Sequence, residues 1–143
     1  MSITPSEGDY RFFDFTVLVR DLDPQAHMAN HVYVAYLSEA RARYIFHLAE
    51  AARWMIPSVV ADVQCAYRSP LLPREDFRVG VRVGRIGRTS VAFEYEIRTT
   101  DRVIANARSV EVLVDAGTRR PRVIPEALRS LLAPPAAARG AEP

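Results

Sequence analysis

The stretch RDLDPQAHMANHVYVAYLSEARARYI, residues 20–45, leads from a polar junction into a segment with helical periodicity. Apolar residues recur at spacings of three and four and form one stripe, made of Tyr33, Leu37, Ala40, Tyr44 and Leu48. This pattern predicts one long helix over about residues 30–53, closed by Pro57, with Arg41 and Arg43 off the stripe. A helix with a single apolar stripe must bury it against a second layer of structure.

The second layer is predicted from the alternation of apolar and polar residues, which is typical of half-buried strands. One such segment precedes the helix, at residues 10–20, and four follow it, at residues 58–68, 77–86, 89–100 and 103–115. The turn sequences IGRT and TTDR join the last three as hairpins. The sequence PEALRSLL, residues 125–132, predicts a short terminal helix.

Strands joined by hairpins are antiparallel, so the expected fold class is α+β, with one long helix against a sheet of about five strands. We expect one domain over residues 1–132 and a Pro/Ala-rich tail over residues 133–143. One helix cannot cover both faces and the edges of such a sheet. A partner chain is therefore expected, in a homodimer or a homotetramer.

The composition narrows the possible functions. All 19 basic residues are arginine, and the absence of lysine excludes a Schiff-base lysine and a P-loop. The formal charge is only +2 and the arginines are scattered, so we expect no nucleic-acid partner. No apolar run approaches the ~18 residues of a membrane span, and the first residues lack a signal-peptide core, so we expect a cytoplasmic protein without a membrane partner. Cys65 is the only cysteine and no Cys/His cluster has metal-site spacing, so neither a disulfide nor a metal is expected.

The polar junction before the helix has the groups that a hydrolytic site needs. Pro24 disfavours helical dihedral angles at Asp23 and holds this carboxylate extended just before a helix start. Backbone amides at such a start, near Asn30, carry partial positive charge and can stabilise an oxyanion. The alternative is purely structural, because Asp is common in turns and both Asp and Asn are good helix caps. Asp21 has the character of a solvated strand end.

The order of the elements and several motifs resemble the 4-hydroxybenzoyl-CoA thioesterase-like family of hotdog-fold acyl-CoA thioesterases. That family's junction follows the pattern Asp-x-Asp-x-x-Gly-His-Val-x-Asn-x-x-Tyr, and the residues in register here are Asp21, Asp23, His27, Asn30 and Tyr33. Downstream, a Tyr-x-x-Pro motif, an Arg-x-Gly-x-x-Ser motif and the ending EVLVD also match. The resemblance covers about residues 12–132.

The resemblance implies a curved antiparallel sheet around one long helix, and hydrolysis of an acyl-CoA thioester without metal or cofactor. It implies that Asp23 acts as nucleophile or general base and that helix-start amides form the oxyanion hole, with Asn30 and His27 as further catalytic residues. The residues expected to bind the substrate are Tyr33, Arg85 and Arg88.

Two departures from the family pattern bear on the site. Ala26 stands where the family has glycine, and a left-handed backbone there would cost an alanine ~1–2 kcal/mol. Ala29 replaces a common asparagine. Two other functions stay open: a non-catalytic module that binds acyl-CoA or acyl-carrier protein, and a hotdog hydratase or dehydratase, whose usual His–carboxylate pattern is absent from this helix.

Overall fold

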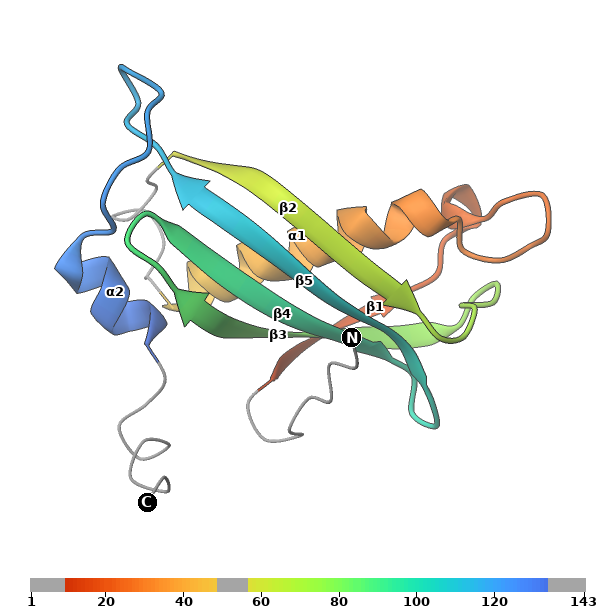
Figure 1. Cartoon of the computed structure of the whole chain (residues 1–143). Coiled ribbons are helices and arrows are strands. Elements are labelled where there is room, and N and C mark those ends of the chain that lie inside the picture. The colour runs from red at the N-terminus through yellow and green to blue at the C-terminus, as the bar shows by residue number, and fades with distance from the viewer. Residues whose placement is uncertain (1–9, 49–56, 134–143) are drawn as a thin grey trace.

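The computed structural model of the chain describes residues 10–48 and 57–133. Its centre is one antiparallel sheet, with α1 (Asn30–Leu48) lying along one face and α2 (Glu126–Leu132) at one end (Figure 1). The strands are β1 (Arg11–Thr16), β2 (Ser58–Tyr67), β3 (Asp76–Ile86), β4 (Ser90–Arg98) and β5 (Val103–Leu113). The predicted α+β class, with five strands and one long helix, is confirmed.

The strand order is β1-β3-β4-β5-β2, and every neighbouring pair is antiparallel. The three central strands follow one another through hairpins, and backbone hydrogen bonds from Gly87 to Ser90 (2.7 Å) and from Thr99 to Arg102 (2.9 Å) close the turns. β1 and β2 are the two edges of the sheet. Because α1 lies between them in the chain, the helix runs along the sheet while carrying the chain from one edge to the other.

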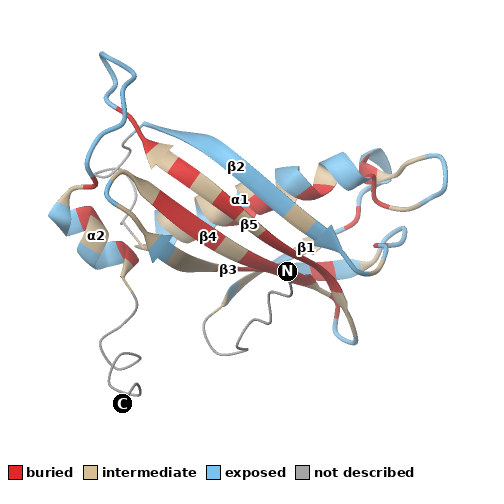
Figure 2. Cartoon of the chain, viewed as in Figure 1, coloured by how far each residue is buried: buried red, intermediate tan, exposed pale blue. Residues whose placement is uncertain are grey.

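The core lies between α1 and the inner face of the sheet. The side chains of β4 predicted to share a face, Val91, Phe93, Tyr95 and Ile97, are fully buried, but Ala92 and Glu96 on the other face are buried as well, so burial does not alternate along this central strand. The helix contributes Tyr33, Leu37 and Ala40 from its apolar stripe. Figure 2 shows the burial concentrated on the central strands, while β2 and the outer side of α1 stay exposed.

The first strand is shorter than the sequence predicts, because the chain leaves the sheet at Thr16 and forms a 3₁₀ turn, Val19–Asp21. The Asp21 carboxylate holds this turn: its Oδ2 accepts hydrogen bonds from the Leu18 amide (2.9 Å) and from the Tyr36 hydroxyl (2.5 Å). Asp21 is 5% exposed, so the expectation of a solvated strand end is wrong. Burial, together with the hydrogen bond to Asp21, raises the pKa of Tyr36 to about 12.

Arg41 lies off the apolar stripe but turns inward, which the helical pattern does not predict. Its guanidinium donates to the Tyr95 hydroxyl (2.9 Å) and forms an ion pair with Glu111 of β5. Tyr95 in turn shares a hydrogen bond of 2.6 Å with Ser109. A small polar network is therefore enclosed between α1 and the sheet, where its members satisfy one another.

Two further predictions concern residues that lie partly or wholly outside the described chain. The helix is assigned up to Leu48, and the rest of its predicted length lies outside the described residues. The same is true of the C-terminal tail from residue 134. Within residues 10–48 and 57–133, no helix is long and apolar enough to cross a membrane.

Candidate active site

The loop before α1 is built around the Asp23 carboxylate. Its Oδ1 accepts hydrogen bonds from the backbone amides of Gln25 (2.9 Å) and His27 (3.2 Å). The main chain closes the same loop, with the Asp23 amide donating to the His27 carbonyl (2.8 Å). The second oxygen, Oδ2, has no hydrogen-bond partner among the described residues. One oxygen of Asp23 therefore shapes the loop while the other stays available for chemistry.

The loop requires a left-handed residue at position 26, as the comparison with glycine suggested. Ala26 has φ of 59°, and its amide donates to the Asp23 carbonyl at 3.0 Å. For an L-residue with a side chain, this conformation costs ~1–2 kcal/mol. The loop geometry thus persists here with alanine in a strained position.

We expect Ala26→Gly to stabilise the protein. Removing the left-handed penalty outweighs the ~0.5–1 kcal/mol that glycine's extra backbone entropy costs, so the free energy of unfolding should rise by about 1 kcal/mol. That change corresponds to a melting temperature higher by roughly 2–5 °C, measured by calorimetry. Ala35→Gly in the exposed interior of α1 is the control and should destabilise by about the same amount. If the Ala26→Gly protein melts at a lower temperature than the wild type, the left-handed backbone at position 26 does not destabilise the wild type.

The start of α1 is anchored on both sides and leaves amides free. The Met28 amide donates to the Leu71 carbonyl and the Ala29 amide to the Asp21 carbonyl, both at 2.9 Å. The next two amides, of Asn30 and His31, donate to no other residue in the described chain. Unpaired amides at a helix start carry partial positive charge, which suits a developing oxyanion.

A cavity of about 360 Å³ brings the loop and the helix start together with the end of β2. Its lining residues are Asp23, His27, Met28, Asn30, Tyr33, Tyr67, Arg68, Ser69 and Pro70. Four of the residues predicted from sequence therefore share one cavity, namely Asp23, His27, Asn30 and Tyr33. The other two, Arg85 and Arg88, lie at or beside the β3–β4 turn, at the opposite end of the sheet from the start of α1 (Figure 1).

The sequence does not predict that the wall at the end of β2 belongs to the site, although this segment contains the Tyr-x-x-Pro motif. The Tyr67 hydroxyl donates to the Asn30 carbonyl (2.8 Å), and the Tyr67 ring meets Tyr33 edge-on, with centroids 5.0 Å apart. The Leu71 amide donates to the Tyr33 hydroxyl at 3.3 Å. Burial raises the pKa of Tyr33. This aromatic pair ties the wall to the helix start.

Arg102, in the turn just before β5, makes several contacts with the same wall. Its guanidinium donates to Ser69 Oγ (3.1 Å) and to the Pro70 carbonyl (2.9 Å) and forms a two-pronged ion pair with Glu75, the shorter contact being 2.6 Å. The hydrogen bond from Arg102 lowers the pKa of the Glu75 carboxyl. Arg102 therefore ties the segment between β2 and β3 to the turn before β5.

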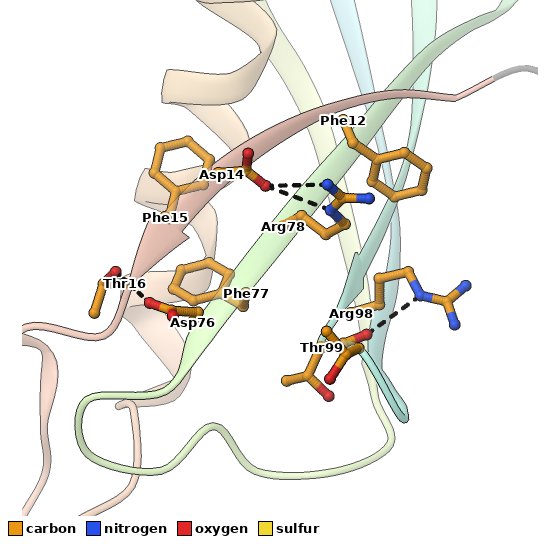
Figure 3. Close-up of a pocket in the computed structure, with 10 residues that line it drawn as sticks. Phe12, Asp14, Phe15, Thr16, Asp76, Phe77, Arg78, Arg98 and Thr99 are labelled. Atoms are coloured by element: carbon orange, nitrogen blue, oxygen red, sulfur yellow. Dashed lines mark hydrogen bonds and ion pairs between the residues drawn. The ribbon is translucent and has the colours of Figure 1, made fainter.

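Two larger cavities have no residue in common with this one. One, of about 730 Å³, lies against β1 and the neighbouring ends of β3 and β4 (Figure 3). Its charged side chains are already paired: Arg78 with Asp14 at 3.3 Å, Arg98 with Glu96 at 3.0 Å, and Asp76 accepts from Thr16 at 2.7 Å. The other, of about 720 Å³, lies beside Asp21 and Tyr36, which bond to each other. Size therefore does not distinguish the candidate cavities; the free carboxylate oxygen and the free amides favour the smaller one.

Within the described residues, no group of three or more His, Cys, Asp and Glu side chains is arranged to hold a metal ion. Asp23 and His27 line the candidate cavity together, but no third such side chain joins them there. The functional groups that line the cavity are therefore one carboxylate, one imidazole, two tyrosine hydroxyls, the polar side chains of Asn30, Arg68 and Ser69, and backbone amides.

The chain is similar in sequence and in structure to known proteins. Residues 17–132 match the family model described as the thioesterase-like superfamily. No curated protein is similar enough in sequence to count as a match. A thioesterase from Thermus thermophilus, solved with coenzyme A and Zn, is 30% identical, with a TM-score of 0.79 over 89% of this chain and 94% of that chain.

Two more solved structures extend the likeness. The PA5185 protein of Pseudomonas aeruginosa is 26% identical, with a TM-score of 0.79 over 88% of this chain and 91% of that chain. A 1,4-dihydroxy-2-naphthoyl-CoA thioesterase from Synechocystis has a TM-score of 0.78 over 86% of this chain and 95% of that chain, but at 12% identity it supports the fold alone. The expected hotdog fold is confirmed.

Proposed function

The chain belongs to the thioesterase-like superfamily and is a thioester hydrolase, and from this premise we propose that it hydrolyses acyl-CoA to a free acid and coenzyme A at the cavity that contains Asp23. The observation that carries the proposal is that Asp23, whose Oδ2 is free, shares one cavity with Asn30, the first residue of α1, whose amide is unpaired; the unpaired His31 amide follows it in the chain.

In the proposed reaction the thioester carbonyl oxygen accepts hydrogen bonds from the amides of Asn30 and His31. Asp23 Oδ2 either takes a proton from water, whose oxygen attacks the carbonyl carbon, or attacks that carbon itself to give an anhydride that water then opens. In the first route the carbon–sulfur bond breaks after water has added, and in the second it breaks as the anhydride forms, before water opens it. In both, coenzyme A leaves as a thiolate and takes up the proton that the attacking water loses. The amides bind the oxygen more strongly as its negative charge grows, which is what lowers the barrier.

The remaining predicted residues have places in this scheme. His27 and Tyr33 line the cavity and are proposed to contact the thioester and the acyl group. Arg85 and Arg88 are proposed to bind coenzyme A phosphates. Because they lie at the far end of the sheet in one chain, we expect them to serve the site of a partner chain. A cytoplasmic location stays a prediction.

A panel of acyl-CoA thioesters with aromatic, short and long acyl groups tests the function, with release of free thiol as the readout. We expect at least one member to be cleaved at an enzymatic rate. If none is cleaved while coenzyme A or acyl-CoA still binds, the chain is a binding module and the proposed hydrolysis of acyl-CoA is wrong.

The exposed edge of the sheet supports a dimer. β2 is ten residues long, and its side chains Val59, Val60, Val63 and Tyr67 are between 36% and 48% exposed. A long edge strand with apolar side chains and unpaired backbone groups favours pairing with another chain. We propose that two copies pair along β2. The cavity lies at the end of this strand, so a partner's residues would come close to it.

Light scattering at micromolar concentration should therefore give a mass at least twice 16.1 kDa. The double variant Val60→Lys/Val63→Lys should shift the protein toward the monomer, because two charges would be buried in the interface. Val123→Lys is the matched control: Val123 is 48% exposed but lies outside the sheet, so this variant should assemble like the wild type. A wild type that stays monomeric at this concentration would rule the dimer out.

A further inference from the structure

Arg68 lies directly after β2 and lines the cavity that contains Asp23. Its backbone is fixed, because its amide and that of Ser69 both donate to the Ile104 carbonyl, at 2.8 and 3.2 Å. Its side chain is exposed, and Nε donates to Asn106 Oδ1 at 3.0 Å. Asn106 is itself 5% exposed, so the acceptor that orients the guanidinium is a buried part of the sheet.

The partner of Arg68 is neutral, and this sets it apart from the arginines around it. Arg102 is paired with Glu75 at 2.6 Å, and Arg98 with Glu96 at 3.0 Å. No carboxylate pairs with Arg68 in the described parts of the chain. The structure thus holds one guanidinium in place without neutralising it, and leaves both of its Nη groups open to an anion.

The position of Arg68 also suits a ligand that reaches past the cavity. Side chains alternate along a strand, so Asn106 points away from α1, while its neighbours Ala105 and Ala107 face the core. The guanidinium that bonds Asn106 therefore lies on the face of the sheet opposite α1, at the end of β2. Arg102 fixes the segment that follows, so little order is lost when a ligand binds there.

We propose that Arg68 binds a phosphate group on the thiol carrier of the substrate, while the thioester lies at Asp23. The proposal rests on the proposed function and adds a specificity-determining residue to it. A pantetheine arm places many bonds between the thioester and the first phosphate, which matches a cation on the rim of the cavity and not beside Asp23. Arginine pairs with phosphate through two parallel N–H donors.

The test compares two thioesters of one acyl group, acyl-CoA and acyl-pantetheine, which lacks phosphate. Arg68→Gln should lower kcat/KM for acyl-CoA roughly 10- to 100-fold, mainly through KM, because the lost contact is made equally in the ground and transition states. Hydrolysis of acyl-pantetheine should not change. Arg68→Lys should recover part of the loss, because it keeps the charge but not the paired donors. An equal loss on both thioesters would show a merely structural role and overturn the proposal, as would no loss on either.

Arg20→Gln is the matched control, since Arg20 is also exposed but lines the cavity beside Asp21 and Tyr36. It should leave both substrates unaffected. Acyl-phosphopantetheine, which carries one phosphate, separates the sources of that group. If Arg68→Gln loses as much activity on it as on acyl-CoA, Arg68 binds the phosphate that a carrier protein also has; if the loss is found on acyl-CoA alone, Arg68 binds the nucleotide end.

Binding of free coenzyme A, measured by calorimetry, tests the role of Arg68 without requiring catalysis. Wild type should bind coenzyme A more tightly than Arg68→Gln does, by the same roughly 10- to 100-fold factor. If that difference is found although no thioester is hydrolysed, the phosphate site stands and the proposed reaction fails. If thioesters are hydrolysed but coenzyme A binds both proteins equally, the reaction stands and the role of Arg68 fails.

Discussion

Asp23→Asn is expected to lower kcat on a cognate acyl-CoA by about 100- to 10,000-fold, the range that general-base help provides, and by more if Asp23 is the nucleophile. Asparagine keeps an Oδ1 that can accept from the Gln25 and His27 amides, so the loop should survive. What it loses is the charge and basicity of the second oxygen, which is the free one. The melting temperature should therefore change little while turnover falls.

Asp115→Asn is the matched control for this experiment. Asp115 also uses Oδ1 to accept two loop amides, from Gly117 (2.9 Å) and Thr118 (2.8 Å), but it follows β5 and does not line the cavity. Its substitution should leave turnover near the wild-type level. Steady-state kinetics with melting curves on both variants decide the matter. If Asp23→Asn keeps more than about a tenth of wild-type kcat, Asp23 is only a loop residue.

Asp21→Asn would be a poor comparison, for a reason that the sequence did not show. Asp21 and Asp23 are two residues apart and both precede the helix, yet one is buried under Tyr36 and the other has an oxygen free in a cavity. The difference arises from Tyr36 of α1, which donates to Asp21, and from the 3₁₀ turn Val19–Asp21, which Asp21 closes by accepting from the Leu18 amide. Local sequence patterns do not predict which residues form hydrogen bonds with each aspartate.

The elements themselves were predictable because each has its own period. The helical stripe and the alternation of β4 are local signals. Tyr33, Leu37 and Ala40 of the stripe are buried and Tyr44 packs against the core partly buried, while Val91, Phe93, Tyr95 and Ile97 of β4 are buried as their spacing predicts. The left-handed backbone at Ala26 was also predictable, because a motif with glycine at that position constrains the loop. These features depend on neighbours within a few residues.

The parts of the site that were missed depend on residues far apart in the chain. Tyr67 reaches Asn30 across 37 positions, and Arg68 reaches Asn106 across 38. Which residues meet at such distances follows from the pairing of β2 with β5 and from the course of α1 along the sheet. The same is true of Arg41, whose inward turn needs Tyr95 and Glu111 as partners. Sheet register, which the strand pattern alone leaves open, decides these contacts.

Asn30→Pro is expected to lower kcat by about 100- to 1,000-fold, because it removes one of the two backbone donors proposed for the oxyanion. Asn30 is the first residue of α1, where proline is well tolerated, and the preceding Ala29 lies outside the helix and can take the extended backbone that proline prefers. The carbonyl of residue 30 remains to accept from Tyr67. The fold should therefore persist, and the substrate should still bind through contacts that do not involve this amide.

Asn30→Ala separates the amide from the side chain, because alanine keeps the N–H and removes only the carboxamide. If the backbone donor is what stabilises the oxyanion, Asn30→Ala should retain most of the activity that Asn30→Pro loses, and KM should be similar in both. Single-turnover kinetics on the two variants, with melting temperatures in parallel, measure this difference. Equal losses in the two proteins would assign the effect to the Asn30 side chain. Near wild-type turnover in Asn30→Pro would place the oxyanion away from this helix start, since a lost donor is otherwise worth at least about 100-fold.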